Sequence, residues 1–369
     1  MNNLLNNIEE ILLMGPGPSC VPDEVYDALS KKTIGHLDPY FITIMDEIKN
    51  QLQIVMKTNN TLTIPVSGTG SAGMETCFVN LIEPGDNVLI LINGVFGKRM
   101  LDVSERLGAN TDTLEYEWGK PIIARDVKTK INEKDYKIVA VVHAETSTGV
   151  ANPVDDIGNL VKDTNALFLV DTVTSLGGMN VSMDEWHIDA LYSGTQKCLS
   201  CPPGLAPISF SEKAINKLTS RKSKVPNWYL DLSMIIKYWE GNKRAYHHTA
   251  PINMLYGLYQ ALYLILEEGL ENVFKRHHDN HKILAAELEK IGIKMFVEPS
   301  CRLPMLNAVC IPDNINEAEI RSILLQEYKI EIGAGLGPLA GKIWRIGLMG
   351  HTARLSSINR LIEALKNII

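Results

Sequence analysis

Residues 61–81, TLTIPVSGTGSAGMETCFVNL, decide the fold. An apolar run from Thr61 to Val66 leads into the glycine-rich segment Ser67 to Gly73, and a helical pattern follows from Met74 to Leu81. A buried strand, a tight turn and a helix in this order are typical of an α/β protein with a largely parallel sheet. The turn also predicts an anion site, because its backbone N–H groups can approach a ligand and the helix dipole favours negative charge.

Four further apolar runs repeat the pattern, at Asn87 to Ile92, Lys137 to Val142, Ala166 to Val170 and Ile188 to Tyr192. Each is rich in Val, Ile, Leu or Ala and alternates little, which indicates burial on both faces. Ligands of open α/β sheets bind beyond the carboxyl ends of the strands. We therefore expect the functional site where these runs end.

The segment from Gly68 to Gly73 also matches Gly-x-Gly-x-x-Gly, the dinucleotide fingerprint, which is weak evidence alone. That interpretation needs an acidic residue at the end of the next strand to hold a ribose hydroxyl. The next strand ends in Asn93-Gly94 instead. A phosphate without a dinucleotide is therefore favoured; the alternatives are a nicotinamide-dependent oxidoreductase and a turn that binds nothing.

Polar side chains follow two of the later strands. Ala166 to Val170 runs into Asp171, and Ile188 to Tyr192 runs into Ser193-Gly194-Thr195-Gln196-Lys197. Taken alone, the aspartate could cap a helix and the lysine could be a solvated charge. Together with the phosphate loop they meet the needs of pyridoxal chemistry, in which lysine forms a Schiff base and aspartate keeps the pyridine nitrogen protonated.

Length and composition set the class of protein. The chain has 369 residues, of which 45% are hydrophobic and 21% charged, and this suits a large globular enzyme. The net charge of -7 argues against nucleic acid and anionic membranes as partners and favours small molecules. Six scattered cysteines, an N-terminus without signal-peptide character and the absence of an 18-residue apolar run predict a cytoplasmic location.

The texture of the sequence changes after residue 250. Ile252 to Glu268 predicts a long helix that Gly269 caps, and Val273 to Ile291 predicts another. We expect an N-terminal arm over residues 1–12, a large cofactor-binding domain over 13–268 and a small α+β domain over 269–369.

Several motifs together resemble the class V aminotransferases of fold type I, and within them the alanine/serine–glyoxylate (or –pyruvate) aminotransferase group. The resemblance spans nearly the whole chain. The matching stretches are Leu13 to Pro18, Ser67 to Gly70, Asn93 to Gly97, Glu145 to Gly149, Val170 to Val173, Ser193 to Lys197, Tyr246 to Thr249 and Trp344 to Gly347. The resemblance implies a mostly parallel seven-stranded sheet sandwiched by helices, with a smaller C-terminal domain.

The resemblance also implies a site. Lys197 and Asp171 would be catalytic, and Phe96, where many relatives have Trp, would stack on the pyridine ring of pyridoxal phosphate. Arg345 would clamp the substrate carboxylate, with Gly17 and Ser147 beside it. Tyr246 and Thr249 would reach the phosphate of the neighbouring subunit, which makes the enzyme a homodimer with shared sites. The complete set of implied cofactor-binding positions is Thr69, Gly70, Ser71, Phe96, Ser147, Asp171, Val173, Gln196, Lys197, Tyr246 and Thr249.

Two activities fit this resemblance. Transamination between alanine or serine and glyoxylate or pyruvate is the first, and Gly35 to Pro39 and Tyr246 to His248 favour it. The second is (S)-ureidoglycine–glyoxylate transamination, because parts of Trp118-Gly119, Gln196 to Ser200 and Gly337 to Arg345 resemble that branch. The sequence does not fix the amino donor, since small apolar substrates differ in binding by only about 1–3 kcal/mol.

Three cysteine and histidine features are interpreted as structural, and no metal is predicted. Cys198-x-x-Cys201 has no second Cys or His pair at a useful spacing, and Pro202-Pro203 cannot begin the helix of a redox motif. His277, His278 and His281 are expected on a solvated helix face. Cys310, the position to check against a desulfurase nucleophile, is expected in a buried strand.

Overall fold

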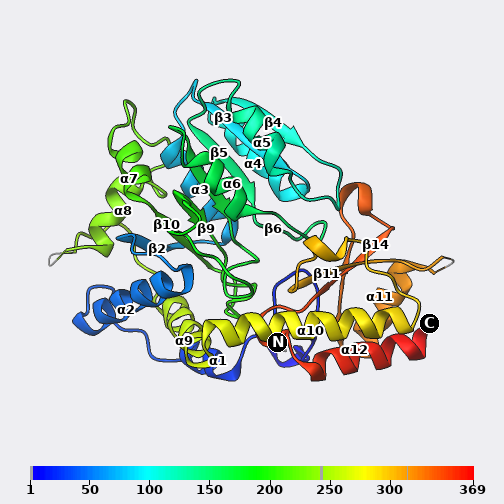
Figure 1. Ribbon diagram of the computed structural model, residues 1–369. Helices are drawn as coiled ribbons and strands as arrows, with labels where there is room; N and C mark the ends of the chain where they lie inside the picture. The colour runs from blue at the N-terminus through cyan, green and yellow to red at the C-terminus, as the bar shows by residue number, and fades with distance from the viewer. Residues whose placement is uncertain (1–2, 242–243, 314) are drawn as a thin grey trace.

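A computed structural model describes residues 3–241, 244–313 and 315–369, and a seven-stranded sheet lies at its centre (Figure 1). The strand order is β2-β10-β9-β8-β5-β3-β4. Four neighbouring pairs are parallel, and β10 runs antiparallel to both of its neighbours. The bounds are β2 Leu62–Ser67, β3 Asn87–Ile92, β4 Asn110–Glu115, β5 Ile138–Val142, β8 Leu167–Asp171, β9 Ala190–Tyr192 and β10 Leu205–Phe210. The prediction of a mostly parallel seven-stranded sheet is confirmed.

Helices cover this sheet. Helix α3, which follows the glycine-rich turn, packs on β9 and β10. Helix α4 packs on β3, and α6 packs on β8. Their apolar residues and those of the central strands form one large hydrophobic cluster, as expected from strands that are buried throughout. The bounds are α1 Asp23–Leu29, α2 Pro39–Met56, α3 Gly70–Leu81, α4 Val95–Arg106, α5 Ala124–Ile131, α6 Val154–Val161, α7 Glu212–Thr219 and α8 Leu232–Trp239.

The C-terminal part has its own sheet and its own cluster of apolar residues. Its three strands are antiparallel in the order β11-β14-β13, and α10 and α12 lie side by side beneath them in Figure 1. The bounds are α9 Ile252–Glu268, α10 Leu270–Lys290, β11 Leu306–Cys310, α11 Glu317–Gln326, β13 Gly333–Ala334, β14 Ile343–Gly347 and α12 Leu355–Ile368. The predicted helix over residues 252–268 and the Gly269 cap are confirmed.

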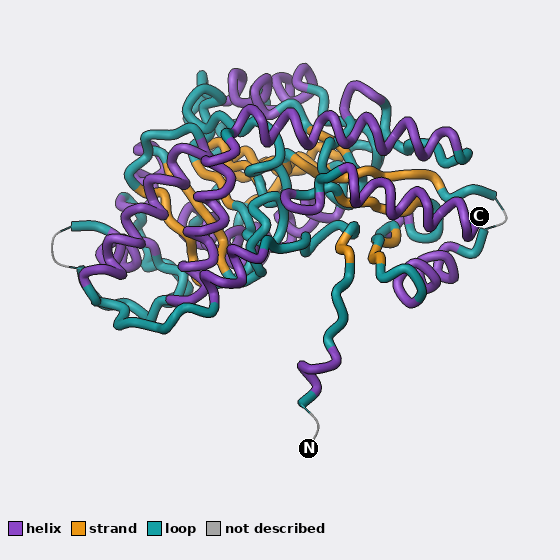
Figure 2. Tube along the Cα trace, turned by 90° about the horizontal axis from the view of Figure 1, so that it is seen from below, coloured by secondary structure: helices purple, strands orange, loops and turns teal. Residues whose placement is uncertain are grey.

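Short elements complete the chain. Strand β1, Leu12–Leu13, pairs with β12, Ile330–Glu331, so the start of the chain joins the C-terminal part. The hairpin of β6, Ala144–Glu145, and β7, Val150–Ala151, follows β5. Figure 2 shows the residues before β1 leaving the body of the molecule, and Leu4, Leu5 and Ile8 are exposed. The domain boundaries at residues 12 and 268 stay predictions.

Helix α10 corrects one expectation from the sequence. His277 and His281 are buried, not solvated as predicted; only His278 is exposed. His277 Nε2 accepts the Gly350 N–H at 2.9 Å, and His281 Nδ1 lies 2.6 Å from Asn307 Oδ1. His281 thus joins α10 to β11, and His277 joins it to the turn after β14. The charged neighbours in the sequence gave no sign of these contacts. Within the described ranges, no group of His, Cys, Asp or Glu side chains could hold a metal ion.

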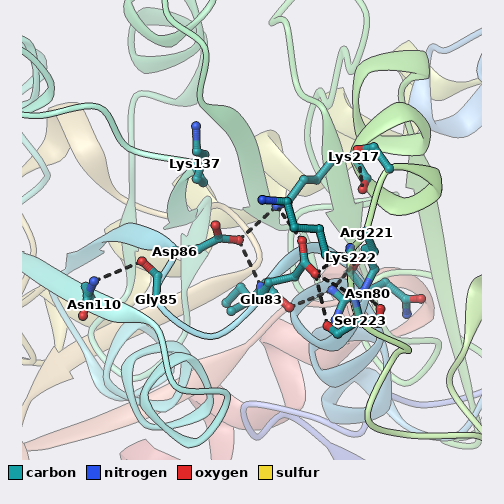
Figure 3. A network of polar contacts seen from close by, with 12 residues as sticks. Asn80, Glu83, Gly85, Asp86, Asn110, Lys137, Lys217, Arg221, Lys222 and Ser223 are labelled. Atoms are coloured by element: carbon teal, nitrogen blue, oxygen red, sulfur yellow. Dashed lines mark hydrogen bonds and ion pairs between the residues drawn. The ribbon is translucent and has the colours of Figure 1, made fainter.

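The C-terminal end of α3 is held by a network of polar contacts (Figure 3). Arg221 Nη1 donates to the carbonyl oxygens of Asn80 and Ile82 at 3.0 and 2.7 Å. The Glu83 carboxylate accepts the N–H groups of Lys222 and Ser223 at 2.9 and 3.1 Å. The last carbonyl groups of a helix lack partners within the helix, so the Arg221 contacts satisfy them and fix the helix axis.

Among the described residues, no helix has the length and apolar character needed to cross a membrane.

Candidate active site

The loop between β2 and α3 brings backbone N–H groups to the carboxyl edge of the sheet. Gly68 has φ +146°, where L side chains are strained, and a Cβ there would lie 2.6 Å from Ala72 Cβ. Gly73 lets α3 approach the sheet, since its Cβ would lie 2.9 Å from Ala206 Cβ. In the described structure the N-cap Thr69 makes no side-chain bond to the helix. The start of α3 is therefore available to an anion.

A cavity opens at this edge of the sheet and contains most of the predicted site. Residues from the ends of β2, β5, β8 and β9 and from the first turns of α3 and α4 line it. They are Thr69, Gly70, Ser71, Met74, Phe96, Arg99, Val142, Ala144, Thr146, Asp171, Val173, Thr174, Tyr192, Gln196 and Lys197. The amine of Lys197 and the carboxylate of Asp171 thus face one space, as the sequence predicts from their positions at neighbouring strand ends.

The Asp171 carboxylate is buried and held in a fixed orientation. Its Oδ1 accepts the Val173 N–H at 2.8 Å, and its Oδ2 accepts the Tyr192 hydroxyl at 2.8 Å. Burial raises the pKa of Asp171 to about 6, against these hydrogen bonds and the charge of Lys197, which lower it. A cationic partner in the cavity would restore the ionised form. Tyr192 is a site residue that the sequence analysis missed, although it ends a predicted strand.

Lys197 projects from the turn after β9, next to the N-terminal segment. Its Nζ donates to the carbonyl oxygen of Pro16. A Cβ at Gly17 would lie 2.6 Å from Lys197 Cδ, so the glycine at this position makes room for the lysine. Burial, and then the positive charge of Arg345, lower the pKa of Lys197 to about 8. A lysine with this pKa loses its proton readily, which a nucleophile or base requires.

Arg345 reaches the site from β14 of the C-terminal sheet. It is only 7% exposed, and its Nε donates to the Ala334 carbonyl at 2.7 Å. Its Nη1 donates to the Thr146 carbonyl at 3.3 Å. Burial lowers the pKa of Arg345 to about 10, while the charge of Glu145 opposes this. The guanidinium stays cationic at neutral pH, next to the amine of Lys197.

A second and larger cavity, of about 800 Å³ against about 110 Å³, lies behind the turn that follows Lys197. Residues 198–200 line it. Among the charged side chains that line it, Arg276 bonds Glu268 at 2.6 Å and the Gly350 carbonyl at 2.8 Å. The predicted site residues line the smaller cavity instead.

The Cys198 and Cys201 thiols are buried, and burial raises the pKa of each to about 12. Cys198 Sγ donates to the Thr174 carbonyl at 3.1 Å. Thiols with such a pKa are poor nucleophiles and poor metal ligands. This supports the structural interpretation of the pair. Cys310 ends strand β11, as predicted, but its side chain is half-buried and not buried.

A family model described as Aminotransferase class-V matches residues 11–360. The chain belongs to the class V aminotransferases. Alanine–glyoxylate aminotransferase of Rattus norvegicus is 41% identical over 366 residues, which cover 98% of this chain and 88% of the relative. (S)-Ureidoglycine–glyoxylate transaminase of Bacillus subtilis (strain 168) is 39% identical over 375 residues, covering 97% and 90%. The crystal structure of an alanine–glyoxylate aminotransferase from Nostoc sp. superposes with a TM-score of 0.95 at 46% identity, covering 100% and 99%.

Membership of the class V aminotransferases makes pyridoxal phosphate the cofactor and transamination the reaction. The nicotinamide-dependent alternative is wrong. The residue at its expected ribose position, Asn93, instead bonds the Lys120 carbonyl and Asn152 Oδ1, each at 2.9 Å. Its amide thus ties the end of β3 to the surrounding loops.

The cavity of this class V aminotransferase fits the cofactor in its donor set. The hydroxyls of Thr69 and Ser71 lie with the start of α3 where an anion would bind. Gln196 Oε1 is buried, has no hydrogen-bond partner among the described residues and belongs to a cavity-lining side chain. Because amide oxygen and nitrogen are assigned from their partners, this amide can equally present its N–H groups to the cavity. Such an orphaned group indicates a missing polar ligand.

Five predicted site residues lie outside the cavity lining, among them Arg345, which is described above. Ser147 is fully buried beneath it: its Oγ donates to Glu145 at 2.5 Å. Gly17 contacts Lys197, as described above. Tyr246 and Thr249 lie at the surface of the single chain, 3.4 Å apart through their hydroxyls. Glu145 lies in the quoted stretch Glu145 to Gly149, but the sequence analysis did not name it as a site residue.

Proposed function

We propose that this aminotransferase moves an amino group between a small amino acid, alanine or serine, and glyoxylate or pyruvate. The observation that carries the proposal is the convergence of Lys197 and Asp171 on one cavity whose rim is the start of α3. The names of the relatives with alanine–glyoxylate activity support the choice of substrates. Glyoxylate and pyruvate both have a carboxylate beside the carbonyl, which suits a single buried guanidinium.

Lys197 acts as anchor and then as base. Pyridoxal phosphate, when bound, supplies a protonated aromatic ring that accepts electrons from the substrate Cα. Lys197 Nζ would anchor the cofactor, and the same amine, when free and neutral, would take the proton from the substrate Cα and hold it for return. The lowered pKa of about 8 leaves a useful fraction of the amine neutral near pH 7.

Asp171 holds a proton on the ring nitrogen. Its carboxylate is oriented by the Tyr192 hydroxyl and the Val173 N–H, so it does not reorganise during turnover. Its pKa, raised by burial to about 6, would fall if a cationic ring nitrogen were bound beside it. Phe96 would stack on the ring of the bound cofactor, and Thr69, Gly70, Ser71 and Gln196 would hold its phosphate.

Arg345 binds the substrate carboxylate. Two of its nitrogens are held by the carbonyl groups of Ala334 and Thr146, which orients the guanidinium plane and leaves its remaining N–H groups for the ligand. The charge of Arg345 also favours the neutral form of Lys197. Substrate recognition and proton removal are thus coupled through one cation.

The proposed enzyme is a homodimer in which each subunit completes the site of the other. Tyr246 is 59% exposed in the single chain, with Thr249 beside it. Exposed aromatic side chains with a polar tip are typical of interfaces. In the dimer these hydroxyls would bind the partner's cofactor phosphate. The cytoplasmic location stays a prediction from the sequence.

Ureidoglycine–glyoxylate transamination is the second candidate, because a relative with that name matches 97% of the chain at 39% identity. The test is a donor panel of alanine, serine, 2-aminobutyrate, kynurenine and ureidoglycine, each mixed with the purified enzyme without an acceptor. Loss of the visible cofactor band with alanine or serine supports the first candidate, and loss with ureidoglycine alone supports the second. Glyoxylate, pyruvate and 2-oxoglutarate then identify the acceptor by restoring the band. If no donor bleaches the band, the proposed substrates are wrong.

A further inference from the structure

The first turn of α4 is capped by residues that are distant in sequence. Ser147 Oγ accepts the Val95 N–H at 2.9 Å, and Glu145 Oε2 accepts the Phe96 N–H at 3.2 Å. Two first-turn N–H groups, which lack partners within the helix, are thereby satisfied from the segment after β5. The N-cap residue, Gly94, has no side chain to contribute.

This arrangement differs from that at other helices of the molecule. Helices α2, α7, α8 and α11 are capped locally, by Asp38, Ser211, Asp231 and Asn316. A Ser or Asp at position 94 would cap α4 in the same way, without burying a carboxylate. The sequence instead has glycine there and places the cap on another element. The distant cap links α4 to the edge of the sheet that carries the site.

The packing around position 94 leaves room for glycine but not for a larger residue. A Cβ at position 94 would overlap the Glu145 side chain and Ser147 Oγ. The backbone of Gly94 is extended, with φ -179°, so the space and not the conformation demands glycine. Glycine therefore admits the Glu145 carboxylate to the helix start.

Every hydrogen-bonding partner of Glu145 is a donor. In addition to the Phe96 amide, its Oε1 accepts the Ser147 N–H at 3.1 Å and the Ser147 hydroxyl at 2.5 Å. The side chain is fully buried, and burial, with the charge of Asp171 adding to it, raises the pKa of Glu145 to about 7. An amide in its place would turn an N–H group toward N–H donors. The ionised carboxylate at a helix N-terminus is the form that these contacts favour.

Helix α4 carries two residues of the cofactor cavity. Phe96 and Arg99 both line it, and Arg99 Cζ lies 5.0 Å from the Phe96 ring centroid. Phe96 is the second residue of the helix, so the cap acts on the backbone of the stacking residue itself.

We propose that Glu145 is a positioning residue for transamination: by capping α4 it holds the Phe96 ring against the pyridine ring of the cofactor. The inference rests on the proposed stacking role of Phe96. Glu145 does not line the cavity and touches no reacting atom. Its effect passes through the N–H group of Phe96, and Ser147 serves the same cap through the N–H group of Val95.

The test compares Glu145→Gln, Phe96→Leu and the double variant. We expect Glu145→Gln to speed amide hydrogen exchange of residues 95–97 in the apoprotein and to weaken pyridoxal-phosphate binding about 3- to 10-fold, the range of one aromatic contact. The visible circular dichroism of the bound cofactor should weaken in parallel. Phe96→Leu should weaken binding by a similar factor, and the double variant by no more than the larger single effect, because both changes remove one contact.

Glu83→Gln is the matched control, since Glu83 also accepts backbone N–H groups but lies at the far end of α3. It should leave cofactor affinity and dichroism unchanged. If Glu145→Gln does not fold, Gly94→Ala disturbs the same cap from its other side and should give the same exchange and binding changes. Multiplied losses in the double variant, or faster exchange with unchanged affinity, would overturn the positioning role alone. Wild-type affinity in Phe96→Leu would overturn the proposed stacking and the inference with it.

Discussion

The two ends of α3 are built for opposite purposes. At the N-terminal end, Thr69 leaves the helix start without a side-chain cap and open to the cofactor cavity. At the C-terminal end, Arg221 bonds two carbonyl groups, and the Asn80 amide bonds the Leu230 carbonyl and the Leu232 N–H. One end keeps its polar groups for a ligand, and the other satisfies them within the protein.

The charged groups around each end show the same difference. Near the cavity, burial dominates and moves pKa values toward neutrality, to about 6 for Asp171 and about 8 for Lys197. At the far end, burial of Glu83 is outweighed by hydrogen bonds from Ser223 and Lys222, which lower its pKa to about 2. Burial without full charge compensation brings the two cavity groups close to neutral pKa values, which suits proton exchange, whereas the hydrogen bonds to Glu83 favour its ionised form and stabilise the fold. Changes near the cavity should therefore alter chemistry, and changes at the far end should alter stability.

The largest effect is expected for Lys197→Met, which removes the amine and roughly keeps the volume. Turnover should fall by about 10²–10⁴-fold or more, because the general base is lost. Below pH 8 the lysine is charged in the folded and the unfolded protein, and burial penalises the folded form. The apoprotein should therefore gain about 1–3 kcal/mol at pH 7. Steady-state rates and urea unfolding of the apoprotein measure both, with the exposed Lys275→Met as control. Retained turnover would show that Lys197 is not the base.

Arg345→Ala should give the next largest effect. The Michaelis constants for amino acids and for 2-oxo acids should both rise about 10- to 100-fold, because a charged hydrogen-bonding group is lost to both substrates. Arg321→Ala, which breaks an ion pair with Glu317 on α11, is the control. An unchanged constant for either substrate class excludes Arg345 as the carboxylate clamp.

The sequence predicted the parts of this comparison that depend on local patterns. The continuous apolar runs identified β3 to the residue, and the polar ends of β8 and β9 identified Asp171 and Lys197. Strand β4 was not singled out, because it lies at the sheet edge and its six residues, NTDTLE, are mostly half exposed. Strand β10 has Pro207 in its centre, which is unusual in a buried strand.

Contacts between distant segments were not predictable in the same way. The role of Glu145 depends on a helix that starts 50 residues earlier, and the burial of His277 depends on the Gly350 N–H, 73 residues later. Gly94 could have indicated the role of Glu145. Glycine has no side chain to cap the helix that follows it, so the free N–H groups of that helix need a partner from elsewhere in the chain. The burial of His277 had no such indication. Lys275 and Arg276 beside it suggested a solvated helix face, and only the tertiary packing shows that the His277 side of α10 is buried.

Arg221→Ala tests the far end of α3. The loss of two charge-assisted hydrogen bonds to carbonyl groups of Asn80 and Ile82 should lower the free energy of unfolding by about 1–3 kcal/mol. Cofactor affinity and turnover should stay at the wild-type level. Arg106→Ala, which breaks an exposed ion pair with Asp102, should change the free energy of unfolding much less, because solvent screens that pair. Weaker cofactor binding in Arg221→Ala would show that the two ends of the helix are coupled.

The smallest effect is expected for Glu83→Gln, and it should depend on pH. At pH 7 the variant should be about 0.5–1.5 kcal/mol less stable, because an amide cannot accept the N–H groups of Lys222 and Ser223 as well as a carboxylate does. The pKa of Glu83 is lowered in the folded protein, so its stabilisation is complete above the ordinary glutamate pKa near 4.5 and is lost as the pH falls toward about 2. Urea unfolding of the apoprotein between pH 7 and pH 3 should show the difference from wild type shrinking below pH 4.5. If the stability difference between Glu83→Gln and wild type grew as the pH fell, the N–H groups of Lys222 and Ser223 would not be what stabilises the Glu83 carboxylate. The contrast between the two ends of α3 would then fail.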